Sequence, residues 1–201
     1  MVFSHPEAAK LIIAYPYVLV MDCTYKTNRY GLPFLEAVGM TSTNMTFTIA
    51  YVFLRNEKEK NFRWALAQIR ALYEPGVLPS VIVTDRELGL INAVEKEFPE
   101  AHHMLCRRHI EMALRARALK VAIQNKEKFA NSVVFTWNEA ISAHTVEEWM
   151  WRWHNFEDKY FNLPQPISYL KQTWLDPYNR RLCRCGLTSI SILVVIPVTD
   201  K

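Results

Sequence analysis

The sequence predicts an α/β fold in which a mixed five-stranded sheet is flanked by helices and followed by a helical region. Three observations support this prediction. Near the N-terminus, three apolar stretches rich in β-branched and aromatic residues follow one another on short connections, which indicates an antiparallel meander. Two further short apolar stretches are each preceded by a helical pattern, which favours crossover connections and parallel pairing. From residue 107 almost to residue 178, the hydrophobic period is helical.

Each predicted strand is a short stretch of apolar residues that ends in turn residues. The five stretches are residues 17–25, 32–40, 46–54, 80–84 and 101–105. Turn residues at 27–31 and 43–44 separate the first three, so we expect those strands to pair antiparallel. The first stretch is nearly all apolar, which is typical of a central strand buried on both faces.

Apolar residues at helical spacing and capping patterns predict the helices. A Ser, Thr or Asn that stands three residues before a Glu suggests a capping box and marks a helix start. Three such pairs occur: Ser4 with Glu7, Asn56 with Glu59, and Thr145 with Glu148. An aromatic stripe follows the last of them: Trp149, Trp153, Phe156 and Tyr160. Its spacing indicates a packed core rather than a platform for stacking bases. A last helix is predicted at 167–174, after the Pro-rich residues 163–166.

From the first predicted strand onward, these elements are strand, strand, strand, helix, strand, helix, strand and then helices. This is the element order of an RNase H-like domain, in which helices cover a mixed sheet and bury its apolar faces. We divide the chain into a core at 1–125, a helical region at 126–185 and an apolar, strand-prone tail at 186–201.

Charge and cysteine content restrict the class of protein only broadly. A net charge of +4 and a pI near 8.9 suit a polyanionic partner such as nucleic acid. His5, Glu7 and Lys10 interrupt the N-terminal stretch, so we expect no secretory signal. The apolar stretch 190–198 is too short to span a bilayer. The four cysteines are therefore expected to be reduced thiols inside the cell.

Two aspartates could carry chemistry, and each has a structural alternative. Asp22 lies within an apolar strand, where an unpaired carboxylate is costly to bury. It either projects as a metal-binding acid or accepts hydrogen bonds from the turn at 24–28. Asp85 follows the strand at 80–84 and precedes a helix, where Asp is also a good N-cap.

The two aspartates say more together than apart. In the RNase H-like order the first and fourth strands are neighbours, which would place Asp22 beside Asp85. Two adjacent carboxylates repel each other unless a cation lies between them. Mg²⁺ or Mn²⁺ suits such oxygen ligands, and a paired site could activate water and stabilise the leaving oxygen of a phosphodiester.

Cys106 and His109 form a Cys-x-x-His pair. These residue types at this spacing can bind Zn²⁺, but one pair supplies two of the four ligands that tetrahedral zinc requires. Cys183 and Cys185 could complete such a site. The alternative is that Cys106 packs in the core and His109 caps or hydrogen-bonds a helix.

Basic residues gather at 107–120 and at 180–184, and either group could contact DNA phosphates. The alternative is a solvated helix face. The candidate DNA-binding residues are Arg107, Arg108 and Lys26.

Ordered blocks at 22–28 (DCTYKTN), 83–99, 102–110 and 169–175 (YLKQTWL) carry a family resemblance. They resemble, in that order, the first-acid strand, the second-acid block, the Cys/His block and the helical insertion of Mutator-like element (MULE) transposases. The form is similar to fungal members of that family. The resemblance covers roughly residues 1–185.

This resemblance implies an Asp-Asp-Glu (DDE) transposase core on an RNase H-like fold. Such enzymes cut DNA at the ends of an element and join it to target DNA, using two divalent metal ions. Matched by position, Asp22 is the first acid and Asp85 the second, and Cys106 and His109 match the Cys/His pair. The implied partner is double-stranded DNA and the implied location is the nucleus, while the oligomeric state stays open.

The chain departs from the family pattern at its end. The third acid of the family lies on a helix after the Trp-Leu and basic segment, whereas residues 186–196 contain no Glu and no helical period. The N-terminal zinc module usual in such transposases is also missing from the pattern. We therefore expect a C-terminally truncated core with little or no catalysis. The alternatives are a domesticated DNA-binding or transcription-regulatory module, and an RNase H-like nuclease with a substituted third acid.

Overall fold

The computed structural model describes residues 1–182 apart from Lys26, Leu163, Asn179 and Arg180. The described chain forms two compact units, one from Met1 to Leu105 and one that begins at Cys106. The predicted strand-prone tail at 186–201 lies outside the described residues.

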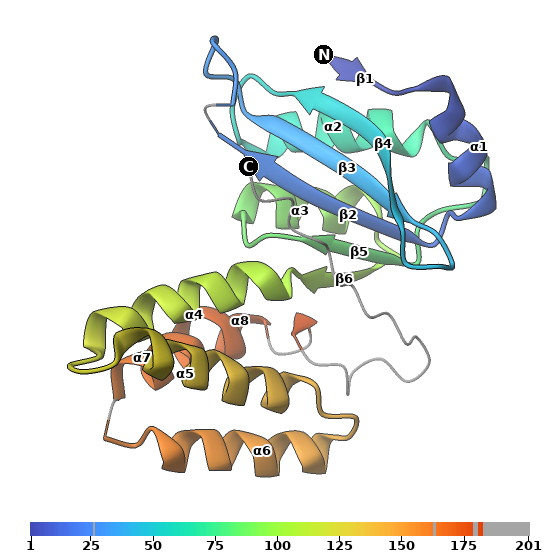
Figure 1. The fold of residues 1–201 in the computed structure, drawn as a ribbon. Coiled ribbons are helices and arrows are strands. Elements are labelled where there is room, and N and C mark those ends of the chain that lie inside the picture. The colour runs from blue at the N-terminus through green and yellow to red at the C-terminus, as the bar shows by residue number, and fades with distance from the viewer. Residues whose placement is uncertain (26, 163, 179–180, 183–201) are drawn as a thin grey trace. The chain divides into compact units, whose positions relative to one another are not determined.

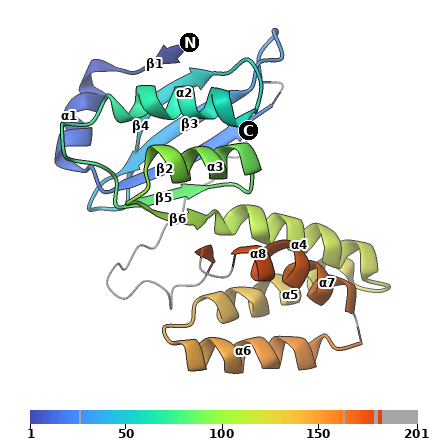
Figure 2. The ribbon, with the colours of Figure 1, turned by 180° about the vertical axis from the view of Figure 1, so that it is seen from behind.

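The first unit is a six-stranded mixed sheet in the order β1-β4-β3-β2-β5-β6 (Figures 1 and 2). Its elements are β1 (Val2–Phe3), α1 (Pro6–Ala14), β2 (Val18–Thr24), β3 (Phe34–Met40), β4 (Thr46–Phe53), α2 (Glu59–Arg70), β5 (Val81–Thr84), α3 (Leu88–Glu97) and β6 (His102–Leu105). β2, β3 and β4 pair antiparallel, whereas β5 is parallel to β2 and β6 is parallel to β5. The predicted α/β fold, with its RNase H-like strand order, is confirmed.

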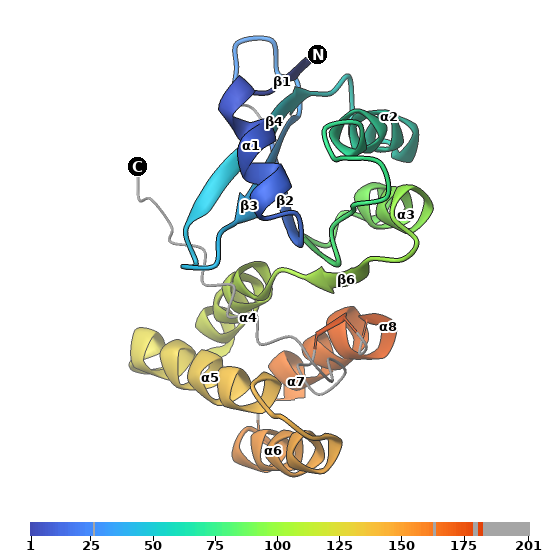
Figure 3. The same ribbon diagram turned by 90° about the vertical axis from the view of Figure 1, so that its right-hand side faces the viewer.

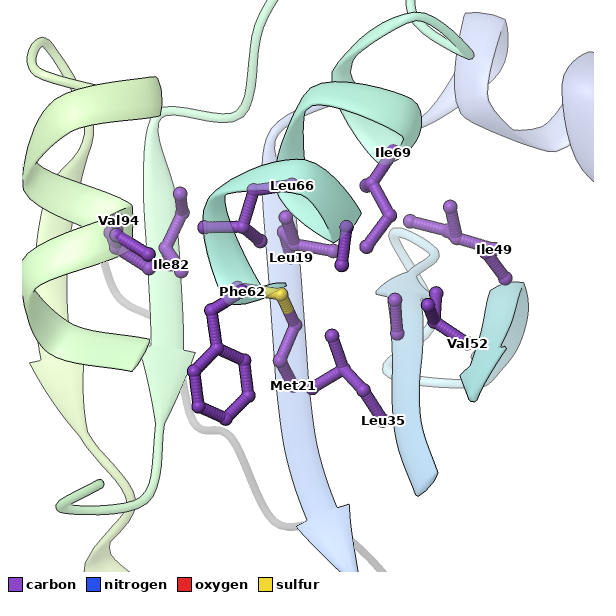
Figure 4. Close-up of a cluster of buried hydrophobic side chains, with 14 of the residues drawn as sticks. Leu19, Met21, Leu35, Ile49, Val52, Phe62, Leu66, Ile69, Ile82 and Val94 are labelled. Carbon is purple, nitrogen blue, oxygen red and sulfur yellow. The ribbon is translucent and has the colours of Figure 1, made fainter. Parts of the chain in front are cut away.

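Helices α2 and α3 lie together on one face of this sheet (Figure 3). Phe62 and Leu66 of α2 pack on Leu19 and Met21 of β2, and all four side chains are almost fully buried (Figure 4). Burial of each such side chain contributes about 1.5–3 kcal/mol. This apolar layer therefore holds the two helices, and it fixes the face of β2 that Leu19 and Met21 occupy.

The N-terminal edge differs from the prediction in two ways. β1 adds a sixth strand, which pairs with β4 and is too short to show any periodicity in the sequence. Ser4, predicted to cap α1, instead donates a hydrogen bond of 2.7 Å to the carbonyl oxygen of Ile49. His5 is the N-cap, and its Nδ1 accepts from the backbone N–H of Glu7. The first capping box is therefore wrong, because the serine hydroxyl is hydrogen-bonded to a carbonyl of β4.

The second capping box is also wrong. α2 begins after Lys58, which makes no side-chain capping bond. Asn56 lies two residues earlier, and its Oδ1 accepts from the backbone N–H of Lys58 and from Nδ2 of Asn61. Asn56 thus stabilises the turn that precedes α2, and it does not cap the first turn of the helix.

The second unit is helical, as the sequence predicts. Its elements are α4 (Arg107–Val121), α5 (Lys126–Ile141), α6 (Val146–Lys159), α7 (Pro164–Leu170), a π-helical turn at Lys171–Leu175 and α8 (Asp176–Tyr178). α4, which lies inside the predicted 1–125 core, is the first helix of this unit. The helix predicted at 167–174 begins at Pro164, as α7, because proline is tolerated in the first turn of a helix. Of the helices described, none is long and apolar enough to cross a bilayer.

The third capping box and the aromatic stripe are confirmed. Thr145 Oγ1 accepts from the backbone N–H of Glu148, and a carboxylate oxygen of Glu148 accepts from the backbone N–H of His144. Trp137 of α5 is fully buried, with its ring edge-on to those of Trp149 and Trp153 at centroid distances of 6.4 and 6.3 Å. The stripe is therefore the core between α5 and α6.

Candidate functional site

Asp22 and Asp85 lie near the same end of the neighbouring strands β2 and β5 in the first unit. β2 and β5 run parallel, with Val18 opposite Val81 and Val20 opposite Val83. Asp22 lies two residues beyond the last paired residue of β2, and Asp85 lies two residues beyond that of β5. Both aspartates are partly exposed. They have the same parity as the paired valines, so the pleat directs Asp22 away from the core face that α2 and α3 cover.

The Cys23 thiol lies in a buried and negatively charged environment. Its pKa is raised above the ordinary cysteine value, first by burial, then by the charge and hydrogen bond of Glu57, and then by the charges of Asp85 and Asp22. Three carboxylates therefore act on one thiol at the carboxyl end of β2. Cys23 stays a neutral thiol at physiological pH.

Sequence reasoning missed two of the acids near this site. Glu57 lies between β4 and α2, and the one available signal was that β4 runs in the same direction as β2, so that both strands end at one edge of the sheet. Glu36 is the register partner of Asp22 on β3. Across the described residues, no three His, Cys, Asp or Glu side chains converge closely enough to hold a metal ion.

The alternative in which Asp85 is the N-cap of α3 is wrong. Glu87 is the N-cap of α3, and its side chain accepts from the backbone N–H of Gly89. Asp85 instead accepts from the backbone N–H of Glu87 at 3.4 Å, in the turn before the cap. The turn after β2 is held by Asn28, whose Oδ1 accepts from the backbone N–H groups of Tyr30 and Leu32.

A buried hydrogen-bond network fixes the end of β5. Thr84 Oγ1 lies 2.7 Å from the carbonyl oxygen of Asp85 and 2.8 Å from Nε2 of His103 on β6. A hydroxyl has one proton, so if Thr84 donates it to the carbonyl, His103 donates from Nε2 to Thr84. Both side chains are buried, so the network holds the backbone that carries the second acid.

With this geometry established, comparison with known proteins identifies the family. Residues 18–113 match the family model of the MULE transposase domain. This segment is a MULE transposase domain. It contains Asp22, Asp85, Cys106 and His109.

Relatives of the MULE domain occur within much longer proteins. Protein FAR1-RELATED SEQUENCE 5 of Arabidopsis thaliana is 26% identical over 89% of this chain and 22% of its own length. Putative protein FAR1-RELATED SEQUENCE 10 of the same plant is 31% identical over 46% of this chain and 13% of its own length. The PKS-NRPS hybrid synthetase cheA of Chaetomium globosum is 29% identical over 46% of this chain and 2% of its own length. The chain thus spans less than a quarter of each of these relatives.

Cys106 and His109 of the MULE domain meet at the start of α4. Cys106 is the N-cap residue, and His109 lies in the first turn. Burial alone would raise the pKa of the Cys106 thiol, but hydrogen bonds from the side chain and backbone of His109 outweigh it and lower the pKa. The structure therefore brings the predicted pair together. Cys183 and Cys185 lie outside the described residues, and zinc binding stays a prediction.

The opposite pKa shifts of the two thiols predict different reactivity. Since the thiolate is the nucleophile, we expect iodoacetamide at neutral pH and in the presence of EDTA to alkylate Cys106 about tenfold faster than Cys23. The rate at Cys106 should also begin to rise at lower pH. Peptide mass spectrometry measures both rates. His109→Gln should slow Cys106 alone, and equal rates at the two thiols in the unaltered protein would contradict the assignment.

The candidate DNA-binding residues differ in their surroundings. The guanidinium of Arg107 hydrogen-bonds Glu111 and Asn138, each at 3.0 Å, and Ser142 at 3.2 Å, which ties α4 to α5. Arg108 is exposed and forms no ion pair with any described residue. Arg108 is therefore the better placed of the two to contact a phosphate. Lys26 lies outside the described residues.

Proposed function

We propose that this MULE domain binds DNA and holds one Mg²⁺ or Mn²⁺ ion at Asp22 and Asp85. The observation that supports the proposal is the parallel pairing of β2 and β5, which puts Asp22 and Asp85 near the same end of two neighbouring strands. Two such groups repel each other without a cation, and their partial exposure leaves room for the water ligands that Mg²⁺ keeps. The residues present therefore fit a divalent cation.

The surrounding residues have distinct parts in such a site. Asp22 and Asp85 hold the cation, and when bound it supplies an activated water and charge stabilisation to phosphodiester cleavage. His103 and Thr84 hold the strand end that carries Asp85. Cys23, whose pKa is raised, adds no negative charge to compete for the ion. Arg108 and the basic balance of the chain supply attraction for the DNA backbone.

We propose further that this 201-residue chain cleaves DNA weakly or not at all. In-line displacement by a transposase requires two fixed metal ions, and the described residues gather no three-ligand group around one point. A DNA-binding or transcription-regulatory role without catalysis is the second candidate, supported by the same observation. A nuclear location follows from the proposed DNA partner.

One experiment tests the DNA-binding and weak-cleavage proposals together. End-labelled duplex DNA is incubated with Mg²⁺ or Mn²⁺ and the purified chain, beside an Asp22→Asn, Asp85→Asn double variant, which keeps the shape of both side chains. We expect both proteins to shift the DNA in a gel and neither to nick it above background. Nicking that the double variant loses would refute the weak-cleavage proposal, and Glu36 and Glu57 would then be the first acids to replace. Absence of any DNA shift would refute DNA binding.

A further inference from the structure

A cavity of about 240 Å³ opens in the first unit beyond the carboxyl end of β2. Two connections line it: the one between β2 and β3, and the one between β4 and α2. The lining residues are Tyr25, Gly31, Pro33, Arg55, Asn56 and Glu57. Because β2 and β4 run in the same direction, their ends meet at this edge of the sheet.

The lining combines an aromatic ring with a cation. The Tyr25 side chain is 58% exposed. Arg55 is exposed too, and in the described part of the chain no carboxylate forms an ion pair with it. The β2–β3 connection also carries an aromatic–cation contact, since the guanidinium of Arg29 lies 4.7 Å from the ring centre of Tyr30. Exposed aromatic rings with arginines beside them are how proteins bind single-stranded nucleic acid without reading its sequence.

The cavity adjoins the acid pair. Glu57 and Tyr25 line it, and Asp22 lies on β2, the strand that ends directly before Tyr25. Tyr25 follows Asp22 by three residues, which is about 10 Å of extended chain. Along a DNA strand that distance corresponds to about three nucleotide steps.

Size and charge restrict the ligand. Pockets for drug-sized molecules are about 300–1,000 Å³, so this cavity suits one flat ring rather than a whole cofactor. Glu57 disfavours a phosphate on its side, but its carboxylate can accept a hydrogen bond from the amino group of a base. The guanidinium of Arg55 can donate hydrogen bonds to the phosphate.

We propose that this cavity binds one unpaired nucleotide of the DNA strand that runs past the acid pair. Tyr25 stacks on the base, and Arg55 contacts the phosphate. The inference rests on the proposed function, because it takes DNA as the partner of the domain. It adds that the strand is locally unpaired there, since a base inside a duplex has no free face to offer Tyr25.

The test measures binding of two single strands of about 12 nucleotides by fluorescence anisotropy without divalent cations, one of oligo(dC) and one abasic. Tyr25→Ala should weaken oligo(dC) binding about tenfold and leave abasic binding unchanged, whereas Tyr25→Phe should bind both as the unaltered protein does. Arg55→Gln should weaken the binding of both strands. Tyr17 lies at the other end of β2 and is 65% exposed, so Tyr17→Ala is the matched aromatic control, and Lys60→Gln is the matched charge control.

These binding measurements test the cavity separately from the metal site. Equal weakening by Tyr25→Ala and Tyr17→Ala, or equal loss on both strands in Tyr25→Ala, would overturn the stacking proposal. Because the assay needs no cation and no cleavage, it can succeed where the acid pair proves inactive. It can also fail while Asp22 and Asp85 still bind Mg²⁺, so failure of the cavity and failure of the metal site are distinguishable.

Discussion

Replacing Asp22 by Asn should abolish the stabilisation of this domain by Mg²⁺. A cation that binds the folded chain alone stabilises it by an amount set by its concentration relative to Kd, about 1.4 kcal/mol at ten times Kd. For a chain of this size that corresponds to a rise in Tm of about 3–6 °C. Without the cation, the variant should melt at the same temperature as the unaltered protein or higher, because one of two adjacent charges is gone. Thermal unfolding with and without Mg²⁺ measures both effects.

The choice of ion and of control makes this test sharp. Mg²⁺ is preferred to Mn²⁺ or Zn²⁺ because it binds thiols and imidazoles of the unfolded chain poorly. Glu74→Gln removes one negative charge from an exposed loop and should keep the full rise with Mg²⁺. If Mg²⁺ raised the Tm of the Asp22→Asn variant as much as that of the unaltered protein, Asp22 would not be a ligand of the ion.

The strands that carry the two aspartates could be predicted from the sequence, whereas the site that the aspartates would form stays a prediction. Asp22 lies near the end of the apolar strand β2, Asp85 follows the apolar strand β5, and the predicted strand order alone makes those strands neighbours. The hydrophobic pattern fixed the strands because each buries one face under α2 and α3. The pairing therefore followed from topology, without knowledge of any side-chain contact.

Other features could not be predicted, because they depend on contacts between distant segments. The Ser4 hydroxyl donates to the carbonyl oxygen of Ile49, and the carboxylate of Glu57 raises the pKa of Cys23. Both pairs are separated by more than thirty residues of sequence. Nothing in the local pattern distinguishes Ser4 from a helix cap. The N-cap of α3 was missed for a local reason: α3 begins at Leu88, so Glu87 rather than Asp85 is the residue that caps it.

The second large effect concerns the helical unit. Trp137→Ala should unfold that unit locally while the sheet of the first unit stays folded. Loss of a fully buried tryptophan costs about 3–5 kcal/mol, and Trp137 contacts both Trp149 and Trp153. Amide hydrogen exchange read by mass spectrometry on the full chain should show protection in α5 and α6 falling about 100-fold or more. Strands β2, β3 and β5 should exchange as before, since their core is formed by a separate set of residues.

Two substitutions separate packing from polarity in this cluster. The indole N–H of Trp137 is buried without a hydrogen-bond partner among the described residues, so Trp137→Phe keeps an aromatic ring and removes an unsatisfied donor. It should cost less than half as much as Trp137→Ala. Trp151 lies on α6 with 65% of its surface exposed, and Trp151→Ala should change stability by no more than about 0.5 kcal/mol. If exchange in β2 accelerated together with exchange in α5, the two units would share one cooperative transition, and the aromatic core would stabilise the acid pair as well as the helices.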